Sequence, residues 1–202
     1  MSGAEELELR LASQEAHREI VDLSFRYSRA CDRLDKALLE SVYWPDGSDD
    51  HGVFKGSAPD YIDWVMGFLA QWTSSHHTNS NHLVEIDGDD ATGECHWIGF
   101  YRYEVDGQPV DQLSAGRYLD RYQRRPSGAG DSAGNKEWRI LHRTCTSEWT
   151  RVVPVENDWR ANAGASIIGV RDRSDPVYHI AGLGAGLGAG LGAGLGAGRD
   201  PG

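Results

Sequence analysis

Apolar and small residues recur at helical spacing through the first third of the chain. Between about residues 12 and 34 they are Ala16, Ile20, Leu23, Tyr27, Ala30 and Cys31, after Ser13 as a candidate N-cap. A short second helix is expected from Asp35 to about Tyr43, before Trp44-Pro45. Ser57 and Pro59 indicate the start of a third helix, which carries Tyr61, Ile62, Trp64, Val65, Phe68, Leu69 and Trp72. The pattern therefore predicts three N-terminal helices.

After these helices the pattern changes to alternation of apolar and polar residues, which is typical of strands. A brief strand at about residues 50–54 precedes the third helix, and long strands are expected at about 76–87, 91–105, 112–124 and 137–149. Asp87-Gly88, Asp106-Gly107 and a Gly/Ser-rich insert at 126–135 separate the long strands. Helices followed by antiparallel strands predict an α+β fold, with the helices packed on one curved sheet.

The two ends of the chain differ from this domain, which is expected to span residues 11–150. Residues 1–10 are acidic and are expected to form a flexible leader. Residues 151–180 show no clear period and are expected to form an arm over the domain or over a neighbouring subunit. Residues 181–202 contain a repeated AGLG unit and are expected to be disordered, because one leucine per repeat cannot offset the entropy of ordering so many glycines.

Composition narrows the classes of function. The chain has 31 Asp and Glu against 20 Lys and Arg, a formal charge of −11, which argues against a nucleic-acid partner. Its three cysteines form no CxxC pair and are expected to be buried thiols. No apolar run approaches the ~20 residues that cross a membrane, and the first residues lack the apolar run of a signal peptide. We therefore expect a soluble, cytoplasmic protein without a membrane partner.

Asp32 and His77 are the first candidates for catalytic residues. Asp32 lies near the C-terminal end of the first helix, where the helix dipole disfavours a carboxylate, so it needs a partner. That partner could be Arg29 or Arg33 at the surface, or His77 at the polar start of a long strand. A carboxylate beside an imidazole fixes its tautomer and produces a base that works near neutral pH.

Two further groups could join this site. Alternation places Arg139, Leu141 and Arg143 on one face of the last strand, and an arginine on the concave side would need an anion or a carbonyl. Asp49-Asp50-His51 could form a two-His, one-carboxylate metal site with His77, but the spacing fits no known ligand motif. We therefore expect no metal, and we expect His51 to line a pocket beside Phe54.

At these residues the chain resembles the SnoaL-like family of the nuclear-transport-factor-2-like superfamily, over about residues 10–150. The residues that carry the resemblance are Ile20-Val21-Asp22-Leu23, Tyr27 and Asp32, Trp44-Pro45-Asp46, Phe54-Lys55-Gly56, His77 and Asn81, Glu85-Ile86-Asp87-Gly88-Asp89, Gly116-Arg117-Tyr118-Leu119-Asp120, and Trp138-Arg139-Ile140 with Arg143. The resemblance implies a cone-shaped, strongly bent antiparallel sheet wrapped by three helices around an apolar cavity. Within the superfamily the pattern is similar to bile-acid 7α-dehydratase, scytalone dehydratase and lindane dehydrochlorinase, which use a His–Asp pair for elimination without a cofactor.

By position, the resemblance implies that His77 is the base, Asp32 its carboxylate and Tyr27 the acid. It also implies that Arg143 holds the substrate and that no cofactor is needed. His51 departs from the family pattern, and we expect it to bind the substrate together with Phe54 and Tyr118. The implied function is a dehydratase-type lyase acting on an apolar, hydroxylated polycyclic or steroid-like molecule, in a homo-oligomer that is a trimer or a dimer. A non-catalytic binding protein, a dioxygenase β-subunit and an isomerase or cyclase remain open, because the same scaffold hosts all of them.

Overall fold

The computed structural model describes residues 2–127 and 135–180 of the chain. Its helices and strands are α1 (Gly3–Arg33), α2 (Lys36–Glu40), β1 (Tyr43–Asp50), β2 (Lys55–Ser57), α3 (Ala58–Leu69), β3 (Ser74–Asp87), β4 (Asp90–Val105), β5 (Gln108–Pro126) and β6 (Lys136–Pro154), followed by the 3-10 turns η1 (Trp159–Asn162) and η2 (Pro176–Tyr178). The predicted helices and long strands are confirmed. The AGLG tail and most of the Gly/Ser-rich insert lie outside the described residues.

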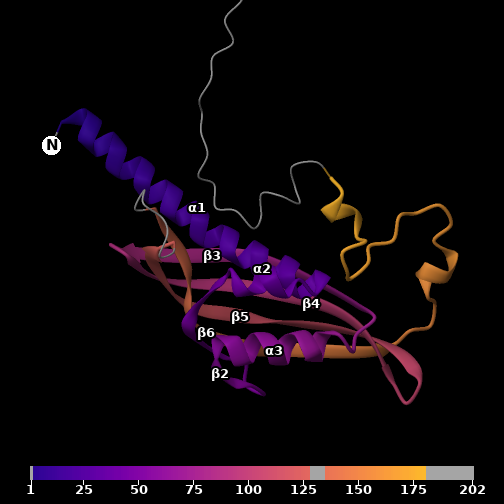
Figure 1. Cartoon of the computed structure of the whole chain (residues 1–202). Coiled ribbons are helices and arrows are strands. Elements are labelled where there is room, and N and C mark those ends of the chain that lie inside the picture. The colour runs from indigo at the N-terminus through magenta and orange to yellow at the C-terminus, as the bar shows by residue number, and fades with distance from the viewer. Residues whose placement is uncertain (1, 128–134, 181–202) are drawn as a thin grey trace, which may run out of the picture.

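The strands form one six-stranded sheet in the order β2-β1-β6-β5-β4-β3. Neighbouring strands are antiparallel except for β1 and β6, which run parallel. All three helices lie on the same side of the curved sheet, with α1 packed along β3 and α3 along β1 (Figure 1). The architecture is the α+β fold predicted, helices on one face of a curved and mostly antiparallel sheet.

The first strand differs from its prediction. We expected only a brief strand at about residues 50–54, but β1 already begins at Tyr43 and contains Pro45. The pairing of β1 with β6 shifts register between Tyr43 and Ser48, and a bulge of this kind accommodates a proline that cannot donate to the ladder. This strand carries Asp49 and Asp50 into the sheet, with Asp49 paired to Arg143 on β6, and His51 follows directly after the strand ends.

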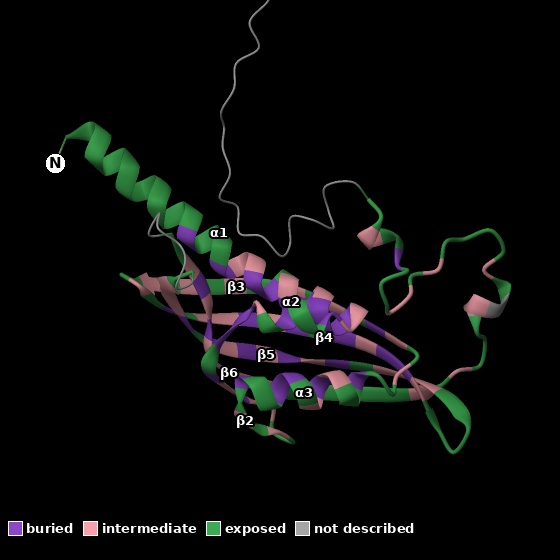
Figure 2. Ribbon diagram, in the orientation of Figure 1, coloured by how far each residue is buried: buried purple, intermediate pink, exposed green. Residues whose placement is uncertain are grey.

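The core lies between the helices and the concave face of the sheet. Ile20 and Leu23 from α1, Leu39 from α2 and Ile140 from β6 are completely or almost completely shielded from solvent. Figure 2 shows the buried residues along the inner side of α1 and α3 and at alternate positions of the strands. No helix among the described residues combines the length and apolar character needed to cross a lipid bilayer.

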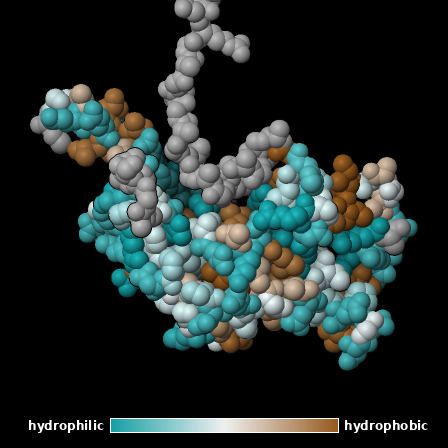
Figure 3. Space-filling view, in the orientation of Figure 1, coloured by the Kyte–Doolittle hydropathy of each residue, from teal (hydrophilic) through white to brown (hydrophobic). Residues whose placement is uncertain are grey.

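Residues 3–10, which we expected to form a flexible leader, are helical, because α1 begins at Gly3. Ser2 and Glu5 form a reciprocal capping box that satisfies the first amides of the helix, and acidic side chains in the first turn suit its dipole. Residues 2–15 are all exposed, and this part of α1 extends beyond the sheet (Figure 2). Apolar side chains, among them Leu7 and Leu11, remain uncovered at this end of the molecule (Figure 3).

Candidate active site

His77 and Asp32 meet as the sequence predicted. The Nδ1 atom of His77 donates to Asp32 Oδ1 at 2.7 Å, and the backbone N–H of His77 donates to Oδ2 at 2.9 Å. Ser75, two residues earlier on β3, donates its hydroxyl to Oδ1 at 3.0 Å. The last turn of α1 therefore holds a carboxylate against the first residues of β3, and three hydrogen bonds fix its orientation.

The same contacts determine the charge of Asp32. Burial by itself would raise the pKa of this carboxyl group, but the hydrogen bonds from the His77 ring, from the His77 backbone and from Ser75 outweigh burial and lower the pKa. The carboxylate is thus ionised and accepts the Nδ1 proton of His77. This arrangement assigns the basic lone pair of the imidazole to Nε2.

A phenol that the sequence did not indicate occupies the other side of His77. The hydroxyl of Tyr101 on β4 lies 3.0 Å from His77 Nε2. Gly99 is the residue paired with His77 across the two strands, and a Cβ there would overlap the Tyr101 side chain, so glycine allows the ring to lie over this position. Burial raises the pKa of Tyr101, which keeps the phenol protonated and able to donate.

Tyr27, predicted as the acid beside His77, lies elsewhere. Its hydroxyl is in close contact with that of Tyr61 and lies 3.4 Å from His51 Nε2. Five residues along an α-helix amount to a rotation of about 140°, so Tyr27 faces the core near α3 while Asp32 faces β3. The structure does not bring Tyr27 to the imidazole of His77.

Instead, Tyr27 contacts a second histidine–carboxylate pair, which is formed by His51 and Asp49. His51 Nδ1 is in close contact with Asp49 Oδ1, and Tyr43 donates its hydroxyl to Asp49 Oδ2 at 2.6 Å. The other ring nitrogen of His51 lies 3.2 Å from the hydroxyl of Tyr61. His51 also lies beside Phe54, and its backbone N–H donates to the Phe54 carbonyl oxygen at 2.8 Å. Neither residue lines the depression that reaches His77.

Arg143 and Tyr118 were predicted to line a substrate cavity, and the structure contradicts this. Arg143 is 0% exposed and donates through Nε and Nη2 to both oxygens of Asp120, each at 2.7 Å. Its guanidinium lies between the rings of Tyr27 and Tyr118, 4.3 and 4.0 Å from their centroids. A buried guanidinium is stabilised by a paired carboxylate and by aromatic ring faces, which Asp120, Tyr27 and Tyr118 provide here. Arg143 and Tyr118 are therefore part of the protein core and do not line an open cavity.

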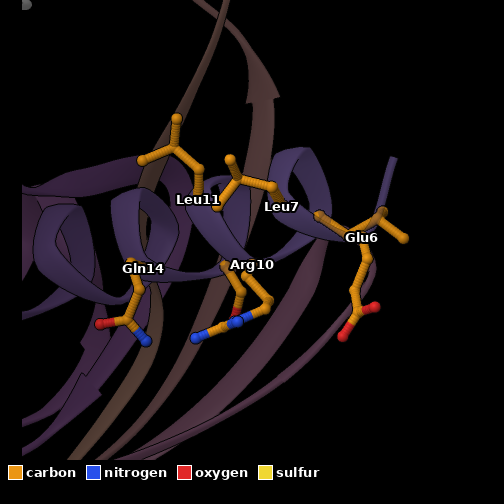
Figure 4. A pocket seen from close by; sticks show the side chains of 7 residues that line it. Glu6, Leu7, Arg10, Leu11 and Gln14 are labelled. Carbon is orange, nitrogen blue, oxygen red and sulfur yellow. The ribbon is translucent and has the colours of Figure 1, made fainter. Parts of the chain in front are cut away.

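The apolar hollow expected inside the sheet is filled by these side chains. Open space instead lies between α1, β3 and the segment after β6, in a depression of about 340 Å³. It is lined by Phe25, Ser28, Arg29, Asp32, Arg33, His76, His77, Asn79 and Val177. A second depression, of about 510 Å³, is lined only by residues of α1 between Glu6 and Gln14 (Figure 4). Only the first of these two reaches the His77–Asp32 pair.

The metal alternative required His51 and His77 in one cluster. Each imidazole instead has its own carboxylate, Asp49 and Asp32 respectively. Within residues 2–127 and 135–180, no group of three His, Cys, Asp or Glu side chains is arranged to hold a metal ion.

Comparison with family models matches residues 12–144, which is more than half of the chain, to a SnoaL-like domain. The protein belongs to the SnoaL-like family. No curated protein matches this SnoaL-like chain.

Solved structures share its fold at low sequence identity. A candidate scytalone dehydratase from Novosphingobium aromaticivorans is 18% identical, with a TM-score of 0.56 over 72% of this chain and 90% of that chain. The LinA-type3 hexachlorocyclohexane dehydrochlorinase from Novosphingobium barchaimii is 21% identical, with a TM-score of 0.55 over 74% and 94%. A nuclear transport factor 2-like superfamily protein from Salmonella enterica is 17% identical, with a TM-score of 0.56 over 77% and 99%. At these identities the similarity establishes the nuclear-transport-factor-2-like fold of the SnoaL-like chain.

Proposed function

We propose that the protein is a cofactor-independent lyase of the dehydratase type, acting on a hydroxylated polycyclic or steroid-like small molecule. The observation that supports this is the fixed imidazole of His77, whose Nδ1 proton is held by Asp32 at 2.7 Å. An imidazole oriented in this way presents Nε2 as a general base at neutral pH. Two structural neighbours, the scytalone dehydratase candidate and the dehydrochlorinase, carry the names of elimination enzymes.

In the proposed reaction, His77 Nε2 removes a proton from a carbon next to a carbonyl group. Asp32 stabilises the imidazolium that forms, because its ionised carboxylate already accepts the Nδ1 proton. Tyr101 leaves Nε2 when substrate arrives and donates its hydroxyl to the enolate oxygen. The neighbouring hydroxyl group then takes the proton from His77 Nε2 and leaves as water, while the electron pair of the enolate forms the carbon–carbon double bond and His77 returns to its neutral form. Tyr101 thus acts as the proton-donating phenol beside His77, the role that the family resemblance implied for Tyr27.

Substrate would reach the base through the depression of about 340 Å³, whose lining includes both His77 and Asp32. Phe25, exposed on α1, offers an apolar surface at this opening. Behind His77, the ring of Tyr101 packs on Trp72 with the two ring centroids 4.4 Å apart. A site that combines aromatic faces with a few fixed polar groups suits an apolar ring system with one or two oxygen substituents.

We predict that His77→Ala and Asp32→Asn each lower turnover by about 10²–10⁴-fold, the usual contribution of a general base and its partner. Purified protein would be screened against steroid and aromatic-polyketide alcohols, with loss of water followed by mass spectrometry. His96→Ala is the matched control, since His96 lies on β4 and pairs with Glu94 instead of joining the site. Wild-type rates from His77→Ala would contradict the proposal.

An isomerase is the second candidate, because the same base and the Tyr101 phenol would also move a proton from one carbon to another. The screen separates the two activities. A dehydratase product is lighter by one water, whereas an isomerase product keeps the mass of its substrate and changes only its absorbance or retention.

We also infer that the protein forms a homo-oligomer through the outer face of the sheet. Ile98, Leu113 and Trp149 are large apolar residues exposed there. Ala115 pairs with Ile98 on one side and with Trp149 on the other, so these residues form a continuous apolar row across β4, β5 and β6. Rows of this kind on a folded protein mark surfaces for association.

A further inference from the structure

Two arginines line the depression that reaches His77, and they differ in how their charges are paired. Arg33 donates to the backbone oxygen of Asp32 at 3.2 Å and forms an ion pair with Asp175 at 3.3 Å. The guanidinium of Arg29 has neither a hydrogen bond nor an ion pair within the described part of the chain, and its Nε is buried without a partner. The wall of the depression therefore carries a positive charge that no described residue pairs with.

The carboxylates around Arg29 are bound to other groups. Asp32 lies three residues after Arg29 on α1, but its oxygens accept three hydrogen bonds from β3. Asp175 on the arm bonds to Arg33 and to two backbone amides of the arm. The sequence left Arg29 open as the partner of Asp32, and the structure gives that place to His77. Arg29 thus remains available to an anion from outside the protein.

The arm fixes the guanidinium of Arg29 in place. This group lies over the ring of Tyr178, 5.3 Å from the centroid. The hydroxyl of Tyr178 donates to Asp35 Oδ2 at 3.0 Å, and the guanidinium of Arg173 also lies over the ring, at 4.6 Å. The N–H groups of a guanidinium point outward in its own plane, so a ring beneath that plane leaves them free to donate.

The rest of the lining indicates which anion fits. Phe25 and Val177 are apolar, and the amide of Asn79 already donates to Ser28 Oγ at 2.6 Å. The two oxygens of a carboxylate match the parallel N–H groups of a single guanidinium. A phosphate ester carries nearly twice that charge and would lie beside the ionised Asp32. One carboxylate on an apolar ring system therefore suits the depression best.

The position of Arg29 also limits where the carboxylate lies on the ligand. Side chains three residues apart on a helix are neighbours, with Cβ atoms about 5–6 Å apart. Arg29 therefore lies beside Asp32, which holds the imidazole of His77 at 2.7 Å, and both Arg29 and His77 line the same depression. A ligand that reaches both residues carries its carboxylate on the ring system itself, close to the carbon that faces His77, and not at the end of a long side chain.

We propose that the substrate of this depression is an acid, whose carboxylate binds to Arg29 while its ring carbon faces His77. The inference rests on the proposed function and narrows its substrate class to hydroxylated ring systems that bear a carboxylate. Arg29 is then a binding residue that determines specificity. Tyr178 is a positioning residue, because it acts through the guanidinium that it supports.

Binding of a small ring acid tests the carboxylate site directly. Naphthoate is the probe, and naphthamide has the same shape without the charge. Isothermal titration calorimetry should show that the wild-type protein binds naphthoate about 10–100-fold more tightly than naphthamide, the usual contribution of a charged hydrogen bond. Arg29→Gln should remove this preference, and Arg29→Lys should restore only part of it, because an ammonium group lacks the planar fork. Addition of naphthoate should also shift the backbone NMR signal of His77.

Arg18→Gln is the matched control, because Arg18 lies on the same helix but is 75% exposed and pairs with Asp22. Equal affinity of the wild-type protein for the two ligands would overturn the inference, and so would a preference that survives in Arg29→Gln. Equal weakening of both ligands in Arg29→Gln would also overturn it, since Arg29 would then support the depression as a whole. An unmoved His77 signal would place the acid elsewhere, and tighter binding of naphthyl phosphate than of naphthoate would reject the carboxylate.

Turnover separates this inference from the proposed function. In the screen for water loss, a hydroxylated polycyclic acid is compared with its methyl ester. The ratio of kcat/KM for the acid to that for the ester should fall about 10–100-fold in Arg29→Gln, through the KM of the acid. A ratio that stays at the wild-type value would overturn the inference and leave the role of His77 intact.

His77→Ala should lower turnover of both compounds and keep the preference for naphthoate over naphthamide. Wild-type turnover by His77→Ala would overturn the proposed function, but the naphthoate preference would continue to support the carboxylate site at Arg29. Loss of that preference in His77→Ala would overturn the inference, because the charge of Arg29 would then not be its source.

Discussion

At the scale of single residues, Asp32 occupies a position that is unfavourable for a carboxylate. It lies in the last turn of α1, where the helix dipole presents its negative end. Hydrogen bonds from Ser75, from the His77 ring and from the His77 backbone outweigh this cost. The site therefore depends on β3 to keep Asp32 ionised, and the stability of the fold depends in turn on that ionisation.

Because the pKa of Asp32 is lowered in the folded protein, its ionisation stabilises the fold above the unfolded value of about 4. This contribution should disappear as the pH falls from about 4 through the lowered folded value. Urea unfolding of the wild-type protein and of Asp32→Asn, between pH 6 and pH 2.5, would measure it. The difference in free energy of unfolding between them should shrink over that acidic range. A constant difference would contradict the assignment.

The pairing of Asp32 with His77 could be predicted from sequence, and the phenol could not. The end of a helix and the start of a strand are both visible in the pattern, and the resemblance to the SnoaL-like family placed the two residues together. Tyr101 reaches His77 from the neighbouring strand over Gly99, which requires the exact register of two long strands. The turn residues in a sequence indicate where a strand ends and the chain reverses. They do not indicate how the residues of two paired strands are aligned, so the sequence alone did not place Tyr101 beside His77.

At the scale of elements, bulges determine which side chains face the core. In β3 the register shifts between Ser80 and Leu83, where Asn81 adopts a left-handed backbone with φ of 49°. Strict alternation along β3 would place Asn81 and Leu83 on the same face as His77, but Leu83 is 68% exposed, and it is Val84 that packs against the core. The bulge thus lets one strand present polar residues at its start and apolar ones at its end.

The last strand shows the same effect. Its register with β5 shifts between Arg121 and Tyr122, so that Ile140 and Arg143 both face inward. Alternation from Arg143 had predicted that Arg139 and Leu141 share its face. One extra residue in a strand exchanges the inward-facing and outward-facing positions of all residues beyond it. A single sequence gives little indication of where such a bulge residue lies.

The left-handed backbone at Asn81 makes the bulge testable. Asn81→Val should destabilise the protein by about 1–2 kcal/mol, because a side chain branched at Cβ is disfavoured in that conformation. Asn81→Gly is the matched control and should be close to neutral, since glycine adopts the left-handed region without strain. Thermal and urea unfolding of the three proteins would measure this. Equal stability of the valine and glycine variants would contradict the role of Asn81.

At the scale of the whole molecule, the segment after β6 is an arm that returns to the helices. Arg171 donates to the carbonyl oxygens of Cys31 and Asp32 at the end of α1. It also donates to those of Leu69, the last residue of α3, and of Trp72, which follows the helix. Helix ends leave such carbonyls without partners, and a guanidinium satisfies several at once. One side chain of the arm therefore joins the two main helices beside the depression that reaches His77.

Arg171→Ala should release the arm. Hydrogen bonds that involve a charged group contribute about 2 kcal/mol, so the arm amides should exchange with solvent at least tenfold faster. The amide of Val170, which donates to Asp175, is a suitable reporter in hydrogen-exchange mass spectrometry. Arg151→Ala, on an exposed position of β6, is the control. Unchanged exchange in Arg171→Ala would show that other contacts hold the arm.

The attachment of Arg171 to the backbone of Asp32 has a practical consequence for handling the protein. A shortened chain that stops before Arg171 would lose the hydrogen bond to the carboxylate-bearing turn, whereas changes near Gly3 fall on a helical end that stands clear of the sheet. Kinetic work is therefore best begun with preparations that keep residues 151–180.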